Sequence, residues 1–286
     1  MNNLISLIIC SRKADISEEL KQNIAETIGC EYELCVIDNS RNEYSIFSAY
    51  NEGVRRAKGD ILCFMHEDVL FRTNKWGGAV ITQFADKSIG AVGFLGGHYL
   101  PDRPSYWTDP RVESVNYIQG EVINGVYSTR QILHQKYRTE NSYVAAIDGC
   151  FMAIPRGLFH EGKLKWDEEN FSGFHYYDMD MCMQINRLGL NIKVVWNILL
   201  EHLSMGNFNS SFINARQVWY NKWKGNLPII RGVEMTEEDI DICRTIMDIT
   251  DQSYQYYQIR QSLAYRLGKA ILHPTRDNIK RLINKQ

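Results

Sequence analysis

The sequence predicts an α/β protein built on a doubly wound sheet, and two observations carry this prediction. First, short β-rich apolar runs alternate with longer segments of helical periodicity through the first third of the chain. This alternation is typical of strands joined by crossover helices. Second, three of the four apolar runs end in polar residues. Because ligands bind at the carboxyl ends of the strands in such sheets, we expect these polar clusters to meet in one site.

The expected elements of the first third follow one another in strict alternation. The strands are expected over 4–10, 33–37, 60–65 and 89–94, and the helices over 16–28, 46–58 and 76–84. The polar clusters that end the first three strands are Cys10-Ser11-Arg12, Asp38-Asn39-Ser40 and His66-Glu67-Asp68.

The middle of the chain, residues 96–120, is rich in Pro, Gly and aromatic residues and has no clear period. We expect a long loop between two halves there, and long ordered loops are often lids or binding segments. A strand over 143–154, broken at Asp148-Gly149, a helix over 178–188 and a strand over 192–196 are expected next. The helix has an apolar stripe formed by Met179, Met183, Ile185 and Leu188.

The C-terminal part is expected to be helical. One helix is expected over 208–223, ended by Gly225 and Pro228, and two more after it. In the last helix Ile259, Leu263, Leu267, Ala270 and Ile271 share one face.

Composition indicates a folded, soluble protein, with 44% apolar and 23% charged residues, which excludes disorder, coiled coil and collagen. The run Leu4–Cys10 has no basic residue before it and is too short to span a bilayer. We therefore expect neither a signal peptide nor a membrane helix, and a cytoplasmic location. The seven cysteines show no C-x-x-C spacing and are expected to be buried thiols.

Charge is unevenly distributed although the net charge is only −2. From Gln258 onward there are seven Lys or Arg and a single acid, whereas 234–251 holds seven acids and one Arg. The basic tail allows two interpretations: a helix on an anionic membrane surface, or pairing with the acidic helix of the same or a second subunit. A nucleic-acid partner is not expected, because the basic residues cluster in one tail without interleaved aromatics.

The stretch FMHEDV places His66, Glu67 and Asp68 directly behind an expected buried strand. A carboxylate pair at a strand end can hold Mg²⁺ or Mn²⁺. The same side chains can equally well solvate the strand end and cap the next element. The six residues alone leave both interpretations open.

Residues 4–227 resemble family 2 glycosyltransferases with the GT-A fold. The resemblance rests on motifs in the family's order: SLIICSRKA, ELCVIDNS, YNEGVRRAKGDILCFMHEDV, IDGCFMAIPRGLF, FHYYDMDMCMQINRLG and VVWNILLEHLSMG. It implies a mixed sheet flanked by helices, with a nucleotide-sugar-binding half (1–95) and an acceptor-binding and catalytic half (96–230). Residues 231–286 would form a helical C-terminal extension.

The resemblance also implies site residues. Asp68, His66 and His202 correspond to ligands of Mn²⁺ or Mg²⁺, in an H-x-D version of the D-x-D motif that resembles a bacterial subgroup. Asp178 corresponds to the catalytic base, and Tyr177 replaces the usual Glu before it. The nucleotide-binding candidates are Cys10, Ser11, Arg12, Asp38, Asn39, Asn51, Arg55 and Glu67. The acceptor-binding candidates are Trp107, Gly149, His175, Tyr177 and Asp180.

The implied reaction is an inverting sugar transfer from a nucleoside diphosphate, with UDP-sugar favoured because Asp38 would accept from the base. The acceptor would be a hydroxyl of a glycan or lipid-linked molecule in surface polysaccharide synthesis, and the enzyme could act at the inner face of the membrane or as an oligomer. A carboxylate with a pKa near 4 would take the proton late, as the hydroxyl acidifies. Asp180 lies about 200° around the helix from Asp178, so the two cannot both face the donor.

Three alternatives remain open. Asp178 could be a simple helix cap. The chain could be an inactive nucleotide or glycan binder, since His66 and Tyr177 depart from the family pattern. A sugar nucleotidyltransferase is the third alternative, although CSRKADISEEL lacks the glycine-rich signature expected of that class.

Overall fold

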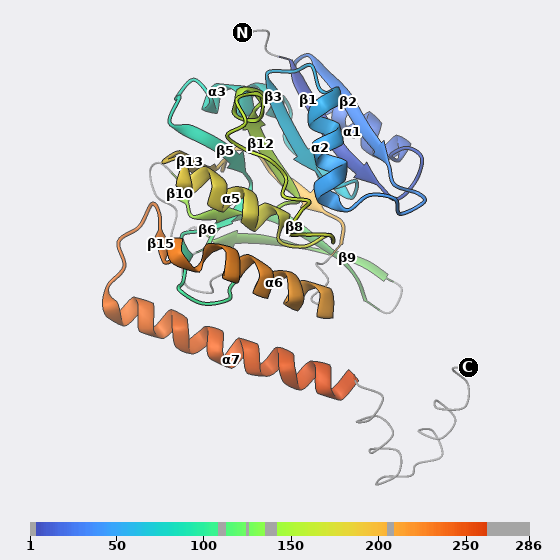
Figure 1. The fold of residues 1–286 in the computed structure, drawn as a ribbon. Helices are drawn as coiled ribbons and strands as arrows, with labels where there is room; N and C mark the ends of the chain where they lie inside the picture. Colours follow the sequence, from blue (N-terminus) through green and yellow to red (C-terminus); the bar gives the residue numbers. More distant parts are fainter. Residues whose placement is uncertain (1–3, 108–112, 124–125, 135–141, 205–208, 262–286) are drawn as a thin grey trace, which may run out of the picture. The chain divides into compact units, whose positions relative to one another are not determined.

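The computed structural model describes residues 4–107, 113–123, 126–134, 142–204 and 209–261 (Figure 1). The chain divides into two compact units, residues 1–235 and 236–286. In the second unit, α7 (Glu237–Gln261) is a single helix that begins in a cluster of acidic residues. The start of the predicted last helix and of the basic tail, residues 258–261, is the end of α7, and the rest of both lies outside the described residues.

The larger sheet of the first unit is mixed. Its strand order is β10 (Tyr143–Val144), β13 (Asn191–Val194), β5 (Ile89–Gly93), β12 (Phe151–Pro155), β3 (Ile61–Met65), β1 (Ile5–Ser11) and β2 (Tyr32–Asp38). β1 runs parallel to β2 and β3, whereas β12 is antiparallel to both β3 and β5. The strand predicted at 89–94 therefore does not lie beside β3, because a strand from the second half of the chain is inserted between them.

Helices flank this sheet, as predicted (Figure 1). They are α1 (Glu18–Thr27), α2 (Ile46–Arg56), α3 (Trp76–Gln83), α4 (Arg156–His160), α5 (Tyr177–Arg187) and α6 (Ser210–Trp223), followed by the short 3-10 turn Lys224–Asn226. Serine side chains start α1 and α2: Ser17 accepts from the amide of Leu20, and Ser45 from that of Ser48. Each of these helices that was predicted ends within two residues of its expected bounds.

The prediction of a long loop over 96–120 is wrong. This segment contains β6 (Leu95–Gly97), β7 (Tyr99–Leu100) and β8 (Glu113–Ile123), and β8 pairs with β9 (Val126–His134). A second sheet has the order β11 (Ala146–Ile147), β6, β8, β14 (Leu200–His202) and β4 (Val69–Phe71), and β7 pairs with β15 (Ile229–Ile230). In β8, Val115 and Tyr117 alternate with Ser114 and Asn116, a two-residue period that the Pro and Gly residues upstream obscured.

The strand predicted over 143–154 is three strands that belong to both sheets. β10 and β12 pair in the larger sheet, and β11 pairs with β6 in the smaller one. Of the two breaks, the first falls at Ala145 and the second at Asp148-Gly149, where a break was expected. The chain therefore crosses from one sheet to the other at these residues.

An aromatic cluster fills the core between α2 and α5. Tyr50 packs against Phe64 and Trp166 with ring centroids 5.0 Å apart, and against Tyr177 at 5.7 Å. The seven cysteines are free thiols, five of them buried and two partly buried. No helix in the described part of the chain is long and apolar enough to cross a bilayer.

Candidate functional site

Strand register brings Asp148–Cys150 beside His66. β12 runs antiparallel to β3, and Phe151 pairs with Met65, so the start of β12 meets the end of β3. The His66 amide continues this ladder by donating to the carbonyl of Cys150 across 3.0 Å. Residues far apart in the sequence thus meet at the carboxyl end of β3.

A second pairing brings His202 to Asp68. β14 is antiparallel to β4, with His202 opposite Val69, so the end of β14 lies beside the residue that precedes β4. The amide of Leu203 donates to the Asp68 carbonyl (2.8 Å), and the Ser204 hydroxyl donates to Asp68 Oδ2 (2.5 Å). The segment that follows β14 therefore holds both the backbone and the carboxylate of Asp68.

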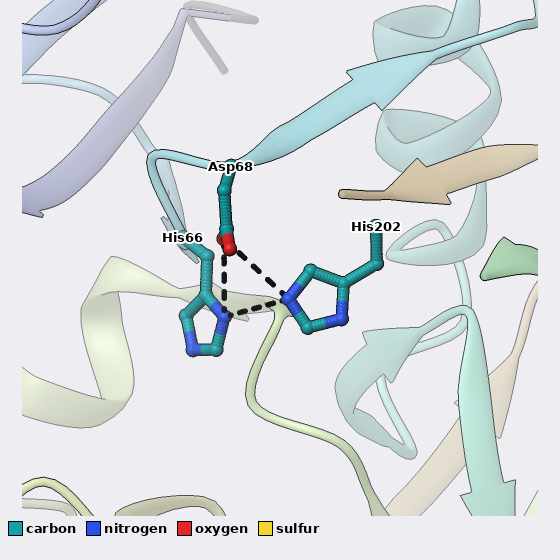
Figure 2. A group of neighbouring side chains, drawn as sticks. All are labelled: His66, Asp68 and His202. Atoms are coloured by element: carbon teal, nitrogen blue, oxygen red, sulfur yellow. Dashed lines mark hydrogen bonds and ion pairs between the residues drawn. The ribbon is translucent and has the colours of Figure 1, made fainter. Parts of the chain in front are cut away.

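His66, Asp68 and His202 form a cluster in which one ligand atom from each lies within 4.8 Å of the others (Figure 2). His66 Nδ1 is 3.3 Å from His202 Nε2 and 3.7 Å from Asp68 Oδ1, and His202 Nε2 is 3.4 Å from the same oxygen. Two imidazole nitrogens and a carboxylate oxygen converge on one point, so the residues fit a divalent cation. Because Mg²⁺ prefers oxygen ligands, this mixed set suits Mn²⁺ better.

Glu67 is not one of the three residues of this cluster. Its carboxylate accepts from the Ser11 hydroxyl (2.6 Å) and from Arg12 Nε (2.8 Å). Glu67 therefore ties the end of β1 to the turn after β3, which holds two of the predicted nucleotide-binding residues at the edge of the cation cluster.

Asp178 lies at the second position of α5 and is only 2% exposed. Its Oδ2 accepts from the Tyr106 hydroxyl (3.0 Å) and the Gly149 amide (3.1 Å), and its Oδ1 accepts from the Met179 amide (2.8 Å). The residue that caps the helix is Tyr176, in left-handed conformation and without a side-chain cap bond. The alternative that Asp178 is a simple helix cap is therefore wrong.

Tyr177 connects the two parts of the site. Its hydroxyl is 2.6 Å from His66 Nε2, and Asp178 is the next residue in the chain. A Cβ atom at position 149 would clash with this hydroxyl, so the tyrosine occupies space that only glycine leaves open. The cation cluster and the buried carboxylate are thus linked through one side chain.

The other predicted acceptor-binding residues take different positions. Trp107 is buried, and its indole donates to Asp148 Oδ2 (3.0 Å). His175 packs edge-on against Phe212 at 5.5 Å. Asp180 is 1% exposed and accepts from Gln184, Lys222 and Trp223, so its contacts join α5 to α6. Roles for these three in acceptor binding stay predictions.

Apart from Arg12 and Glu67, the predicted nucleotide-binding residues fall into two groups. Cys10, Ser11, Asp38 and Asn39 lie together at the paired ends of β1 and β2, where Asp38 is exposed and Asn39 accepts from and donates to Tyr44. Asn51 and Arg55 lie on α2: the Asn51 amide bonds to the backbone of Trp166, and Arg55 pairs with Glu52. Nucleotide contacts by either group stay predictions.

A cavity of about 700 Å³ lies at the opposite end of the strands. Its lining includes Ile61, Phe84, Ile89, Leu158 and Leu190, near the starts of β3 and β5. This cavity is separate from the cation cluster, which lies at the carboxyl end of β3.

A protein-family model described as a glycosyltransferase-like family matches residues 6–226, most of the chain. The chain belongs to this glycosyltransferase-like family. Together with the mixed sheet and its flanking helices, membership confirms the predicted GT-A fold. Among curated proteins, none matches the sequence.

Several solved structures resemble this glycosyltransferase-like protein. They include GalNAc-T7 with UDP, GalNAc and Mn²⁺ (14% identity, 77% of this chain, 50% of that chain, TM-score 0.49). A mannosyltransferase from Pyrobaculum calidifontis with GDP-Man and Mn²⁺ has 12% identity, 93% and 83% coverage and a TM-score of 0.47. S. aureus TarS (residues 1–349) has 14% identity, 68% and 59% coverage and a TM-score of 0.43. The glycosyltransferase-like chain thus spans half the length of GalNAc-T7.

The pKa values of Asp178 and Asp68, the two carboxylates of the glycosyltransferase-like site, shift in opposite directions. Burial, and then the nearby charge of Asp148, raise the pKa of Asp178 to about 7, against hydrogen bonds from Met179, Tyr106 and Gly149 that lower it. The value near 4 assumed from the sequence is therefore wrong for this buried position. Burial also raises the pKa of Asp68, but hydrogen bonds and charge from His202 outweigh it and hold that pKa well below its usual range.

The two histidines of the cluster shift in opposite directions. Burial, followed by the neighbouring His202, lowers the pKa of His66. Burial would also lower the pKa of His202, but its hydrogen bond to Asp68 and the charge of that carboxylate raise it overall. A neutral His66 and an ionised Asp68 suit a cation ligand set, whereas His202 would have to release the proton that its contact with Asp68 favours before it could bind a cation.

Sequence reasoning did not predict the contacts that three further residues make in the glycosyltransferase-like site. Asp148 accepts from Trp107 and from the Cys150 amide beside Asp178, Tyr106 bonds Asp178, and Ser204 bonds Asp68. The available signal was Asp148 itself, a carboxylate at the break of an expected strand. Tyr106 and Ser204 carried no comparable pattern.

Proposed function

We propose that this protein is a metal-dependent inverting glycosyltransferase. It moves a sugar from a nucleoside diphosphate, UDP favoured, to a hydroxyl of a glycan or lipid-linked acceptor in surface polysaccharide synthesis. The observation that carries the proposal is the contact between His66 and Tyr177, which sets a cation-ligand cluster one residue from a buried carboxylate whose pKa is raised to about 7.

Asp178 serves as the general base. A carboxylate with a pKa near the working pH accepts a proton from a sugar hydroxyl more readily than one near 4. The donors to Asp178, the Tyr106 hydroxyl and the Gly149 amide, fix the direction of its carboxylate. The acceptor hydroxyl attacks the anomeric carbon and gives its proton to Asp178, and the nucleoside diphosphate leaves.

His66, Asp68 and His202 would hold the cation. A bound divalent cation supplies Lewis-acid neutralisation of the charge that develops on the departing diphosphate. The Glu67 bonds to Ser11 and Arg12 keep the end of β1 against this cluster. Asp38, exposed at the end of β2, would accept from a uracil or thymine imide of the nucleotide base.

Thermal shift against UDP, GDP, dTDP and CMP, each with Mn²⁺, Mg²⁺ or EDTA, tests the donor site. A ligand present at about 100 times its Kd stabilises the folded state by about 2.7 kcal/mol. We expect stabilisation by one nucleotide that EDTA removes. If no nucleotide stabilises the protein with any metal, the donor site is wrong.

Asp178→Asn tests the base. This variant should lose sugar transfer at least 100-fold while its metal-dependent nucleotide shift stays at the wild-type size, because the carboxylate acts only on the acceptor proton. Wild-type turnover in this variant removes Asp178 as the base. If the wild type binds nucleotide and metal yet transfers no sugar with any donor, the inactive-binder alternative is favoured.

The location belongs to the same proposal: cytoplasmic, with peripheral contact at the inner face of the membrane through the basic tail from Gln258 onward. Flotation with anionic and neutral vesicles, in low and high salt, tests it. Binding to anionic vesicles that salt removes supports membrane contact. If no such binding occurs, the remaining interpretation is that the basic tail pairs with the acidic helix of the same or a second subunit. The mass from sedimentation would reveal a second subunit.

A further inference from the structure

Tyr177 has the position of a residue that sets the proton arrangement of His66. The imidazole has two ring nitrogens, and in its neutral form one carries the proton while the other offers a lone pair. His66 Nδ1 faces Asp68 and His202, and Nε2 faces the Tyr177 hydroxyl at 2.6 Å. Nδ1 can bind a cation only if the proton is on Nε2.

The structure assigns Tyr177 as the positioning residue for His66: its hydroxyl oxygen accepts the Nε2 proton and thereby directs the Nδ1 lone pair at the cation cluster. This inference rests on the metal centre of the proposed function. It gives Tyr177 a role different from the acceptor contact predicted from sequence. Partners that orient a histidine ligand through its second nitrogen are a general feature of metal sites.

The surroundings of Tyr177 fix its hydroxyl in this place. The ring is 6% exposed and packs against Phe47 (6.4 Å), Tyr50 (5.7 Å) and Trp166 (6.1 Å). Gly149 leaves the space that the hydroxyl occupies. A side chain packed on these sides cannot swing away from His66, so the hydrogen bond costs little side-chain entropy.

The helix gives this contact a second consequence. Tyr177 and Asp178 are adjacent in the first turn of α5, so one helix end holds both the base and the partner of a cation ligand. A displacement of this turn would disturb both at once. Tyr177 therefore fixes the position of the cation cluster relative to the base Asp178.

Tyr50→Phe is a matched control for Tyr177→Phe. Tyr50 is fully buried, contacts the same ring cluster, and its hydroxyl has no hydrogen-bond partner among the described residues. Each change removes one buried hydroxyl from adjacent rings, but only one of the two hydroxyls faces His66.

Mn²⁺ binding to the full chain, measured by the EPR signal of free Mn²⁺, tests the inference without any sugar or nucleotide. We expect Tyr177→Phe to weaken Mn²⁺ binding 10- to 100-fold and Tyr50→Phe to leave it within about 2-fold. Asp68→Asn and His66→Ala, which remove ligands, should weaken it at least as much as Tyr177→Phe.

The outcomes separate the two proposals. If Asp68→Asn and His66→Ala weaken Mn²⁺ binding but Tyr177→Phe matches the wild type, the positioning role is wrong and the metal centre stands. If Asp68→Asn binds Mn²⁺ as the wild type does, the metal centre itself fails. A Tyr177→Phe variant that loses its near-UV CD spectrum has lost its packing.

For a Tyr177→Phe variant that loses its packing, the ¹⁵N spectrum of the wild-type histidines with Zn²⁺, a diamagnetic cation, decides instead. A proton on Nε2 of the ligated His66 is expected, and a proton on Nδ1 overturns the inference.

Discussion

The hydroxyl of Tyr106 donates a hydrogen bond to Oδ2 of Asp178 across 3.0 Å. Tyr106 belongs to the segment between β7 and β8, and its ring packs on Tyr176 and Phe212. A residue outside all regular elements thus reaches a carboxylate that is buried at the start of α5. This bond favours the ionised form of Asp178, whereas burial and Asp148 favour the neutral form.

Tyr106→Phe should raise the pKa of Asp178 above about 7. The change removes a donor that stabilises only the ionised carboxylate, and a hydrogen bond to a charged group contributes about 1.5–3 kcal/mol, so a rise of about one to two pKa units is expected. Carboxyl ¹³C NMR titration measures it. Tyr32→Phe, in β2 away from the site, is the control, and an unchanged Asp178 titration in Tyr106→Phe contradicts the assignment.

Asp148→Asn should shift the same titration in the opposite direction. Asp148 contributes a nearby negative charge that raises the pKa of Asp178, so its neutralisation should lower that pKa by about one unit. The acidic limb of the pH profile of the transfer rate should move to lower pH by the same amount. Trp107→Phe, which removes the indole that donates to Asp148 but keeps the charge, is the comparison. A titration that rises in Asp148→Asn would contradict the charge argument.

Asp178→Asn should stabilise the fold more at pH 8 than at pH 4. The folded pKa of about 7 exceeds the ordinary aspartate pKa of 3.8, so the folded state holds this proton more tightly. The resulting stability is complete below pH 4 and is lost as pH rises toward 7. The difference between variant and wild type should therefore grow by the order of a few kcal/mol over that window. Urea unfolding at several pH values measures it, and a constant difference would argue against the raised pKa.

Lys222→Met should destabilise the first unit by about 2–4 kcal/mol. The Lys222 ammonium lies 2.6 Å from both Asp167 and Asp180, whose side chains are almost entirely buried. Its removal leaves two buried carboxylates without their cation, although partial exposure of the lysine limits the loss. Urea midpoints compare it with Lys224→Met, which changes an exposed lysine two residues later. Equal midpoints for the two variants would show that the bridge contributes nothing.

Most of the elements could be predicted from the sequence because their signals are local. The apolar run Ile61–Met65 and the stripe on α5 are each contained in one segment. The strands of 96–120 were missed because β8 depends on partners such as β9 and β14 for its stability. Strand pairing between distant segments leaves little trace in the strand itself.

The site shows the same division. His66, Asp68, His202 and Asp178 were predicted as site residues through a family resemblance, and the structure brings the first three within reach of one cation. The raised pKa of Asp178 could not be predicted, because it depends on burial and on Asp148, 30 residues earlier in the sequence. The Asp180 carboxylate faces α6, where it accepts hydrogen bonds from Lys222 and Trp223. No sequence motif predicts these contacts.

β12 lies between β3 and β5, and the cation cluster takes His66 and Asp68 from one half of the chain and His202 from the other. A fragment that ends before β12 lacks the strand that joins β3 to β5. The halves 1–95 and 96–230 are therefore not separable modules, and neither should fold alone. If the cluster binds a cation as proposed, the site would form only late in chain synthesis, because the cluster cannot assemble until His202 has been added and β14 has paired with β4.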